Sequence, residues 1–347
     1  MQSTLLNKLI EIPSVSREEA AAADMLQQYL LAQGLEPHRV ENNLWVESSP
    51  AGDKPTLLLN AHIDTVKPAS GWKRDPFTPT REGGRIYGLG SNDDGGSVVA
   101  LLEAYKILSA REQPYRLVLS LSAEEEVSGK GGIEKVLEQI GPVAFAVVGE
   151  PTGMQMAVAE KGLMVLDCAA RGVSGHAARN EGVNAIYKAL PAVEWLRTYS
   201  FGKVSPFLGP VKMTVSQIQA GTQHNVVPDL CTFVVDVRSN GLYSNEEILS
   251  EIKTALSGLC DVKERSTRLQ SSHLDLSAPI VGRGKALGLG VFGSPTLSNQ
   301  ALLSCPSLKI GPGDSARSHT ADEYIEIKEI EEAVPLYVKL LDGLKID

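Results

Sequence analysis

Residues 56–64, Thr-Leu-Leu-Leu-Asn-Ala-His-Ile-Asp, form a short apolar run that ends in a histidine and an aspartate. The length of the run and its leucines predict a buried strand over Thr56–Ala61. Further apolar runs are likewise followed by acidic or imidazole side chains: Arg116–Ser122 precedes Glu124-Glu125-Glu126, Ala144–Val148 precedes Glu150, and Ser307–Ile310 precedes His319. This repeated arrangement predicts several buried strands, each followed by polar side chains.

Helical patterns lie between these strands. In Arg17–Gln33 the apolar residues recur near helical spacing, and Gly34 follows as a stop signal. Other expected helices cover residues 3–12, Gly95–Gln113, Ile133–Ile140 and Lys328–Leu344. The alternation of apolar strands with helices predicts an α/β domain with a mostly parallel sheet and helices on both of its faces.

The order of elements changes after about residue 165. The expected elements are then strand Val165–Arg171, helix Asn184–Tyr199, strands Val211–Gln219 and Cys231–Arg238, helix Asn245–Leu259 and strand Val262–Leu269. The order β-α-β-β-α-β is typical of a ferredoxin-like α+β unit. We therefore expect one catalytic α/β domain over residues 1–165 and 273–347, interrupted by a smaller α+β domain over residues 166–272.

The composition is that of an ordinary globular protein of two domains. The chain has 347 residues, of which 43% are hydrophobic and 22% charged. Its formal net charge of −9 argues against nucleic acid as a partner, because an acidic chain repels phosphate backbones. The cysteines form no Cys-x-x-Cys pair, which favours reduced thiols over a zinc ribbon. With no signal-peptide pattern and no apolar run near the ~20 residues of a membrane span, we expect a cytoplasmic protein without a membrane partner.

The polar residues at the strand ends are candidate metal ligands. In an open α/β sheet, sites form outside the carboxyl ends of the strands, so residues far apart in sequence meet there. His62 and Asp64 lie on one side of an extended segment, where Asp64 can orient an imidazole that binds a metal. Asp93 closes a glycine-rich turn before the helix that starts at Gly95, where its carboxylate can either cap that helix or bridge two cations.

Each of these segments also has an ordinary structural explanation. His62 can simply pair with Asp64, Glu124–Glu126 can form a solvated acidic turn, and Glu150 and His319 can be loop residues. Three adjacent carboxylates repel one another at the end of an apolar strand, however, and a bound cation offsets that repulsion. Together with the shared position at strand ends, this favours a metal-dependent hydrolase in which one glutamate binds metal and its neighbour transfers protons.

The inserted domain contributes further candidates. His176, in Gly-Val-Ser-Gly-His-Ala, reaches such a site only across a domain or subunit interface. Asn225 follows a histidine in a similar position. Arg238 can fork onto a substrate carboxylate, and a surface ion pair with Asp236 is the alternative.

Taken together, these segments resemble the M20 family of metallopeptidases and amidohydrolases, which includes acetylornithine deacetylase, succinyl-diaminopimelate desuccinylase, aminoacylases and bacterial carboxypeptidases. The resemblance runs from His62 to His319 and includes the inserted dimerisation or lid domain. It implies one metal held by His62, Asp93 and Glu150, and a second held by Asp93, Glu126 and His319.

The resemblance also implies a role for each remaining candidate: Asp64 orients His62, Glu125 is the general acid and base, His176 contacts the reacting oxyanion in the partner subunit's site, and Asn225 and Arg238 bind substrate. The chain departs from the family pattern at two positions. Glu124 stands where many members carry Asp, and Gly95 stands where many carry Lys. Neither departure removes a ligand.

The activity implied by the resemblance is amide hydrolysis with two divalent ions, Zn²⁺ first and Co²⁺ or Mn²⁺ as alternatives. The short chain, Glu150-Pro151-Thr152 and Gly311-Pro312-Gly313 look most like acetylornithine deacetylases. We therefore expect a homodimer that deacetylates N2-acetyl-L-ornithine in arginine biosynthesis. The alternatives are deacylation of acyl-citrulline or succinyl-ornithine, succinyl-diaminopimelate desuccinylation, dipeptide hydrolysis, and a catalytically silent metal-binding scaffold.

Overall fold

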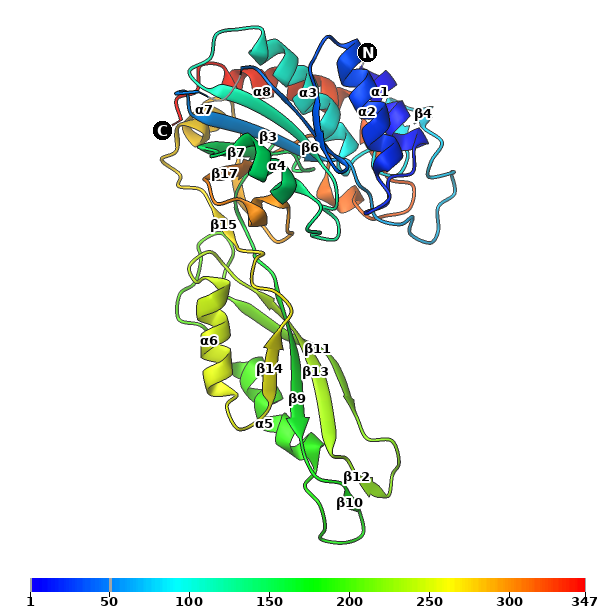
Figure 1. The fold of residues 1–347 in the computed structure, drawn as a ribbon, viewed down its shortest axis with the longest axis vertical. Helices are drawn as coiled ribbons and strands as arrows, with labels where there is room; N and C mark the ends of the chain where they lie inside the picture. Colours follow the sequence, from blue (N-terminus) through cyan, green and yellow to red (C-terminus); the bar gives the residue numbers. More distant parts are fainter. Residues whose placement is uncertain (1, 50–51, 347) are drawn as a thin grey trace. The chain divides into compact units, whose positions relative to one another are not determined.

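The computed structural model describes residues 2–49 and 52–346, which form two compact units (Figure 1). The first, called the α/β unit, takes in the chain up to Val158 together with residues 274–292 and the chain from Ser298 onward. The second, called the α+β unit, contains residues 159–273 and 293–297. Along the described chain, none of the helices combines the length and apolarity that a membrane crossing requires.

A mostly parallel sheet forms the centre of the α/β unit. Its strands lie in the order β1 (His38–Val40), β2 (Asn43–Glu47), β6 (Arg116–Ser122), β3 (Thr56–His62), β7 (Phe145–Val148), β17 (Ser307–Lys309) and β8 (Met156–Glu160). Strand β3 is parallel to β6 and β7, and β17 is parallel to β7, whereas β2 and β8 join antiparallel. Every residue of β3, β6 and β7 is buried, as expected for parallel strands covered on both faces.

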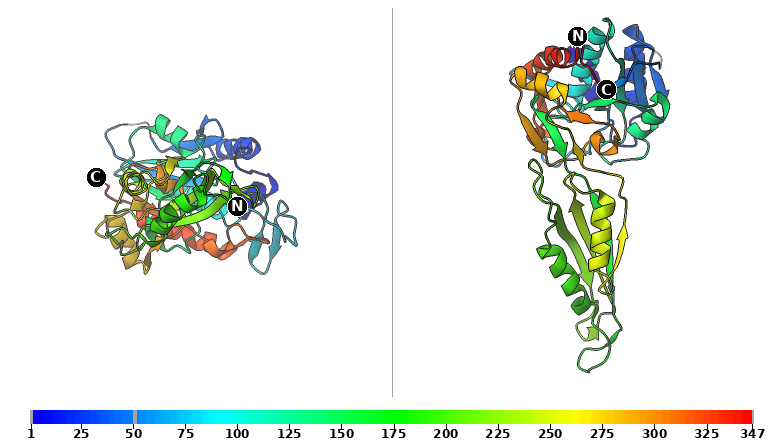
Figure 2. Two further views of the ribbon diagram at one scale, coloured as in Figure 1. Left: turned by 90° about the horizontal axis from the view of Figure 1, so that it is seen from below. Right: turned by 90° about the vertical axis from the view of Figure 1, so that its left-hand side faces the viewer.

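Helices cover both faces of this sheet (Figures 1 and 2). Ile133 and Val136 of helix α4 (Ile133–Ile140) pack on Leu58 and Val118, which are paired on neighbouring strands and therefore share one face. Helix α3 (Gly95–Ser109) lies against β3 and β6 and also contacts α1 (Gln2–Glu11) and α8 (Ile327–Leu341). The helices of the unit are α1 (Gln2–Glu11), α2 (Ala20–Ala32), α3 (Gly95–Ser109), α4 (Ile133–Ile140), α7 (Pro279–Ala286) and α8 (Ile327–Leu341), with 3₁₀ turns η1 (Asn299–Leu302) and η2 (Ser315–Arg317).

A small three-stranded sheet lies in the same unit and was not expected from the sequence. It contains β4 (Thr80–Glu82), β5 (Arg85–Tyr87) and β18 (Tyr324–Glu326), with β5 in the middle. Strand β18 begins five residues after His319, and β5 ends six residues before Asp93. This sheet therefore joins the two loops that carry those candidate ligands.

The α+β unit has the predicted ferredoxin-like order. Its elements are β9 (Met164–Arg171), α5 (Ala185–Thr198), β11 (Lys212–Ala220), β13 (Leu230–Arg238), α6 (Asn245–Ala255) and β14 (Asp261–Glu264). The strands pair antiparallel in the order β11-β13-β9-β14. Alternate residues of β9 and β13 are buried and pack against α5 and α6, which cover one face of the sheet (Figures 1 and 2).

The predicted fold class is confirmed, and the differences concern short elements and the ends of longer ones. Besides β4, β5 and β18, the sequence did not indicate helix α7 or the strands β1, β8, β10 (Gly175–His176), β12 (Val226–Val227), β15 (Ser272–His273) and β16 (Val291–Ser294). The strand predicted over Val262–Leu269 is the shorter β14, and the helix predicted to Gln113 ends at Ser109. Strands of two to five residues carry too little periodicity to be distinguished from loops.

Candidate metal centre

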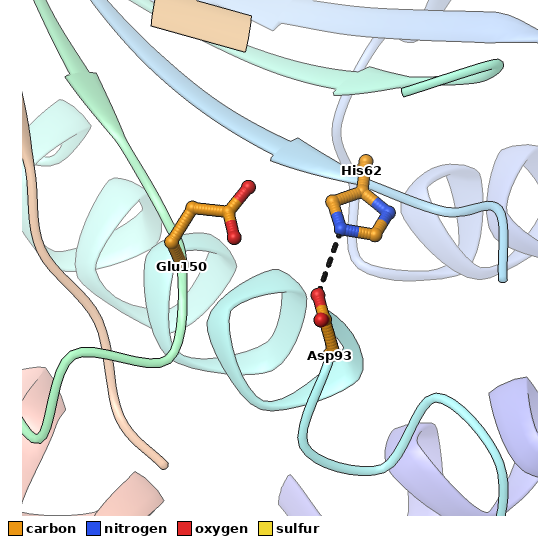
Figure 3. Close-up of side chains that lie close together, drawn as sticks. All are labelled: His62, Asp93 and Glu150. Carbon is orange, nitrogen blue, oxygen red and sulfur yellow. Dashed lines mark hydrogen bonds and ion pairs between the residues drawn. The ribbon is translucent and has the colours of Figure 1, made fainter. Parts of the chain in front are cut away.

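His62, Asp93 and Glu150 lie together at the carboxyl ends of the parallel strands. His62 is the last residue of β3, Asp93 lies in the loop before α3, and Glu150 follows β7. Figure 3 shows the three side chains directed toward one another, and His62 Nε2 lies 3.1 Å from Asp93 Oδ1. One ligand atom from each residue lies within 4.8 Å of the other two. All three residues are buried.

Asp93, Glu126 and His319 form a second group of the same kind. His319 Nε2 lies 2.9 Å from Glu126 Oε2 and 3.7 Å from Asp93 Oδ2. The ligand atoms of this group again lie within 4.8 Å of one another. Asp93 therefore directs one carboxylate oxygen toward His62 and the other toward His319, which is the arrangement of a carboxylate shared by two cations.

Asp93 does not cap the helix that follows it. The N-cap position of α3 is occupied by Asp94, whose side chain makes no capping hydrogen bond and instead accepts one from the backbone N–H of His62, at 3.2 Å.

A β-carbon at Gly95 would lie only 2.4 Å from the carbonyl oxygen of Gly90. The absence of a side chain at Gly95 thus permits a close approach of the loop to the start of the helix.

Asp64 holds both a histidine and the glutamate segment in place. Its Oδ1 accepts a hydrogen bond from the Glu125 N–H at 3.0 Å, and its Oδ2 accepts one from the Glu126 N–H at 3.1 Å and one from the Ser16 hydroxyl at 2.7 Å. His62 Nδ1 lies 2.9 Å from the Asp64 carbonyl oxygen and 3.5 Å from Oδ1. The contact with two consecutive glutamate N–H groups extends the role expected from sequence.

Glu125 has the environment of a proton carrier. Its Oε2 lies 3.9 Å from His62 Nε2, and its side chain is 9% exposed. Burial and the negative charges of Glu126, Asp64 and Asp93 raise the pKa of Glu125 well above its ordinary value, although His62 opposes the shift. A carboxyl with a raised pKa accepts and returns a proton near neutral pH.

The group as a whole suits cations. Burial, followed by the charges of Glu125 and Asp93, raises the pKa of Glu150 well above its ordinary value. Burial lowers the pKa of His62, but hydrogen bonds to Asp64 and Asp93 raise it well above 6.5 overall. The buried Glu150 Oε1 has no hydrogen-bond partner among residues 2–49 and 52–346. Buried polar atoms are normally paired, so these donor atoms fit the two divalent ions implied by the resemblance.

Sequence reasoning missed two further residues at the centre. Glu323 is 2% exposed and accepts hydrogen bonds from the N–H groups of Asn92 and Asp93, at 2.8 and 3.0 Å. Burial, with the charge of Asp93, raises the pKa of Glu323 to about 8. Ser16 binds Asp64 as described above. Neither residue lies at a strand end or in a motif, so no sequence pattern distinguishes Glu323 from the adjacent Asp322.

The remaining candidates lie in the α+β unit. Strands β10 and β12 pair antiparallel, which brings His176 close to Asn225. Next to this pair, the Ala177 N–H donates a hydrogen bond to the Asn225 carbonyl at 3.0 Å. His176 is exposed, and its Nδ1 accepts from the Ala178 N–H at 3.1 Å. Arg238 forms a forked ion pair with Asp236, with distances of 2.8 and 3.0 Å. This ion pair is the alternative to substrate binding that the sequence left open. Catalytic and substrate-binding roles for these residues stay predictions.

Comparisons with curated proteins identify relatives along nearly the whole chain. The succinyl-diaminopimelate desuccinylase of Paracidovorax citrulli (strain AAC00-1) is 28% identical, covering 98% of this chain and 97% of the relative. The protein of the same name from Verminephrobacter eiseniae (strain EF01-2) is 26% identical, covering 98% and 96%.

Solved structures show the same fold. Aminopeptidase PepT from Bacillus cereus ATCC 10987 superposes with a TM-score of 0.79 at 19% identity, covering 99% of both chains. Bacillus subtilis YXEP, described as a dinuclear metal binding peptidase from the M20 family, gives 0.76 at 16% identity, covering 98% of this chain and 96% of that one. The family model for peptidase family M20/M25/M40 matches residues 58–343, and the chain therefore belongs to that family of hydrolases.

Proposed function

We propose that this protein hydrolyses the amide bond of a small N-acyl amino acid at a site with two divalent ions. The observation that carries the proposal is the position of Asp93, with one oxygen toward His62 and the other toward His319. One ion would be held by His62, Asp93 and Glu150, and the other by Asp93, Glu126 and His319. Membership of the peptidase family supports the reaction class.

The proposed chemistry assigns one task to each residue around the centre. When bound, a pair of divalent ions polarises a carbonyl and lowers the pKa of water, and mixed imidazole and carboxylate ligands favour Zn²⁺, with Co²⁺ or Mn²⁺ as substitutes. Glu125 takes a proton from the attacking water and delivers it to the leaving amine. Asp64 holds His62 and the Glu125 backbone in position through the hydrogen bonds described above. His176 donates to the developing oxyanion, from the partner subunit.

The proposed substrate is an N-acylated diamino acid. The curated relatives described above are succinyl-diaminopimelate desuccinylases, whereas the sequence resemblance favours N2-acetyl-L-ornithine or its succinyl equivalent. These compounds share an acyl amide beside a carboxylate and a second amino group. Arg238 and Asn225 are the proposed contacts of the substrate carboxylate. The acetyl specificity and a role in arginine biosynthesis stay predictions, since the names of these relatives favour a succinyl group.

The experiment is a substrate panel with the metal-loaded protein. N2-acetyl-L-ornithine, N2-succinyl-L-ornithine, N-succinyl-L,L-diaminopimelate, N-acetyl-L-citrulline and a dipeptide are incubated separately, and the released amine is measured with and without a chelator. We expect chelator-sensitive turnover of at least one acyl diamino acid. Absence of turnover on all three acyl diamino acids would contradict the proposed substrate class, and tight metal binding without any turnover would favour the scaffold alternative.

We also propose that residues 1–165 and 273–347 act as the metal-binding catalytic domain and that residues 166–272 act as the dimerisation or lid domain. The support for dimerisation is the surface of the α+β unit. Tyr187 and Leu190 on α5 and Ile218 on β11 are 71%, 52% and 53% exposed. Strand β11 lies at the edge of its sheet, and edge strands with nearby apolar side chains are surfaces on which a second chain can pair.

A further inference from the structure

Glu323 is a buried carboxylate that binds the backbone of the loop before α3. Its Oε1 accepts from the N–H groups of Asn92 and Asp93, and its Oε2 accepts from the N–H of Gly90 at 3.2 Å. Its own carbonyl oxygen accepts from the Gly88 N–H at 3.0 Å. One residue therefore fixes most of the loop that ends in Asp93.

The same residue belongs to the segment that carries His319. Glu323 lies four positions after His319 and immediately before β18. Asn92 makes the reciprocal connection, because its side chain donates to the Asp314 carbonyl at 3.1 Å and accepts from the Asp314 N–H at 3.0 Å. Glu323 and Asn92 thus join the Asp93 loop to both ends of the segment on which His319 lies.

His319 depends on this connection for its position. Its side chain is 53% exposed, whereas that of His62 is 1% exposed within the sheet. Its backbone has a φ of 60°, in the left-handed region, which is uncommon for residues other than Gly although Asn, Asp and His adopt it more often than the rest. An exposed side chain on such a turn has little packing around it, so the hydrogen bonds of the flanking loop, together with the contact to Glu126, determine its separation from Asp93.

We propose that Glu323, with the help of Asn92, is a positioning residue that sets the distance between Asp93 and His319 and thereby the affinity of the second ligand group for its ion. The inference rests on the proposed function, because it takes Asp93, Glu126 and His319 as metal ligands. Residues that hold ligands in place typically contribute about 10–100-fold to metal affinity. Asp93 belongs to both groups. The first group should nevertheless lose less metal affinity, because His62 and Glu150 remain fixed by the ends of β3 and β7.

The test is a Co²⁺ titration of the metal-free protein, followed by equilibrium dialysis and by the visible absorption of the bound cobalt. Glu323→Gln replaces one of the two acceptor oxygens with an NH2 group, which cannot accept from N–H groups. Glu323→Asp keeps the carboxyl group and its two acceptor oxygens but shortens the side chain by one methylene, so it changes their position alone. Asp322→Asn is the matched control, because Asp322 accepts from the N–H groups of Lys73 and Arg74, at 3.1 Å each, and these hold no candidate ligand.

We expect the wild type and Asp322→Asn to bind two Co²⁺ ions with the same affinities. In both Glu323 variants the weaker of the two binding steps should lose about 10–100-fold in affinity, with a changed cobalt spectrum for that ion. Unchanged binding in Glu323→Gln and Glu323→Asp would overturn the inference, as would an equal loss in Asp322→Asn. A wild type that fails to bind two ions would instead overturn the proposed function itself.

Discussion

At the scale of single residues, the carboxylate of Asp64 links the parts of the candidate centre most directly. It accepts hydrogen bonds from two glutamate N–H groups and from Ser16, and it lies beside the His62 ring. The sequence indicated an aspartate beside His62 because the spacing of two residues places both on one side of a strand. It did not indicate the hydrogen bonds from the Glu125 and Glu126 N–H groups to Asp64, because these residues lie 61 and 62 positions away along the chain.

Substitution of Glu125 should separate metal binding from turnover. Glu125 is absent from both ligand groups, so Glu125→Ala should retain bound metal while kcat falls by at least about 100-fold. The metal content and the rate of amine release check this. Glu124→Gln is the control, because the Glu124 carboxylate accepts from the Gly131 N–H, away from both groups. A Glu125→Ala variant with a rate near that of the wild type would show that another group carries the proton.

Metal affinity should rise with pH through the neutral range. The hydrogen bond that His319 donates to Glu126, with the charges of Glu126 and Asp93, raises the pKa of His319 to about 8 in the ion-free chain. Below about pH 8 His319 therefore holds a proton that must leave when an ion binds, so affinity falls as pH falls. Calorimetry of Co²⁺ binding at pH 7 in buffers of different ionisation enthalpy measures the protons released. Binding without proton release would contradict this prediction.

At the scale of elements, the long strands and their polar ends could be predicted, and the loops between them could not. Strands β3, β6 and β7 are buried throughout and mostly apolar because helices cover both of their faces. This clear pattern placed His62, the glutamate segment and Glu150 at one sheet edge. Glu323 contacts residues 230 and more positions away, through a loop held by the short strands β5 and β18. Such contacts depend on tertiary packing, which leaves no local periodicity in the sequence.

The junction between the Asp93 loop and α3 should not tolerate a side chain. A β-carbon at Gly95 would lie 2.4 Å from the Gly90 oxygen and 2.7 Å from Leu6 Cδ1. Gly95→Ala should therefore lower the free energy of unfolding by about 1–3 kcal/mol, the usual cost of overpacking. Denaturant unfolding measures this. In Gly282→Ala, the matched helical control, the new methyl group meets no atom within 4 Å, and stability should be unchanged or rise by up to about 1 kcal/mol. Equal stability of the Gly95→Ala variant and the wild type would contradict the prediction.

At the scale of the whole molecule, the order of elements along the chain indicated an interrupted α/β domain, because the β-α-β-β-α-β run of the α+β unit differs from the alternation on either side. The assembly of the chain is a separate question, since the homodimer was expected only from the family resemblance.

A lysine on the edge strand should disrupt that dimer. Ile218 is 53% exposed on β11, and a charge on an edge strand opposes pairing with another chain. Light scattering coupled to gel filtration should give twice the chain mass of 37.2 kDa for the wild type and a single chain mass for Ile218→Lys. Ile107→Lys, at a similarly exposed position on α3 of the α/β unit, should stay dimeric. A monomeric wild type would contradict the proposed role of the α+β unit.

The unequal exposure of the two histidines has a consequence for the rate at which ions leave. The His62 side chain is 1% exposed and that of His319 is 53% exposed, so an ion held beside His62 would have little access to solvent, whereas one held beside His319 would border open water. Brief dialysis against a weak chelator should therefore strip the ion at His319 within minutes and leave the other for much longer. Freshly purified protein would then carry nearer one equivalent than two, and a short incubation with added metal would restore full occupancy.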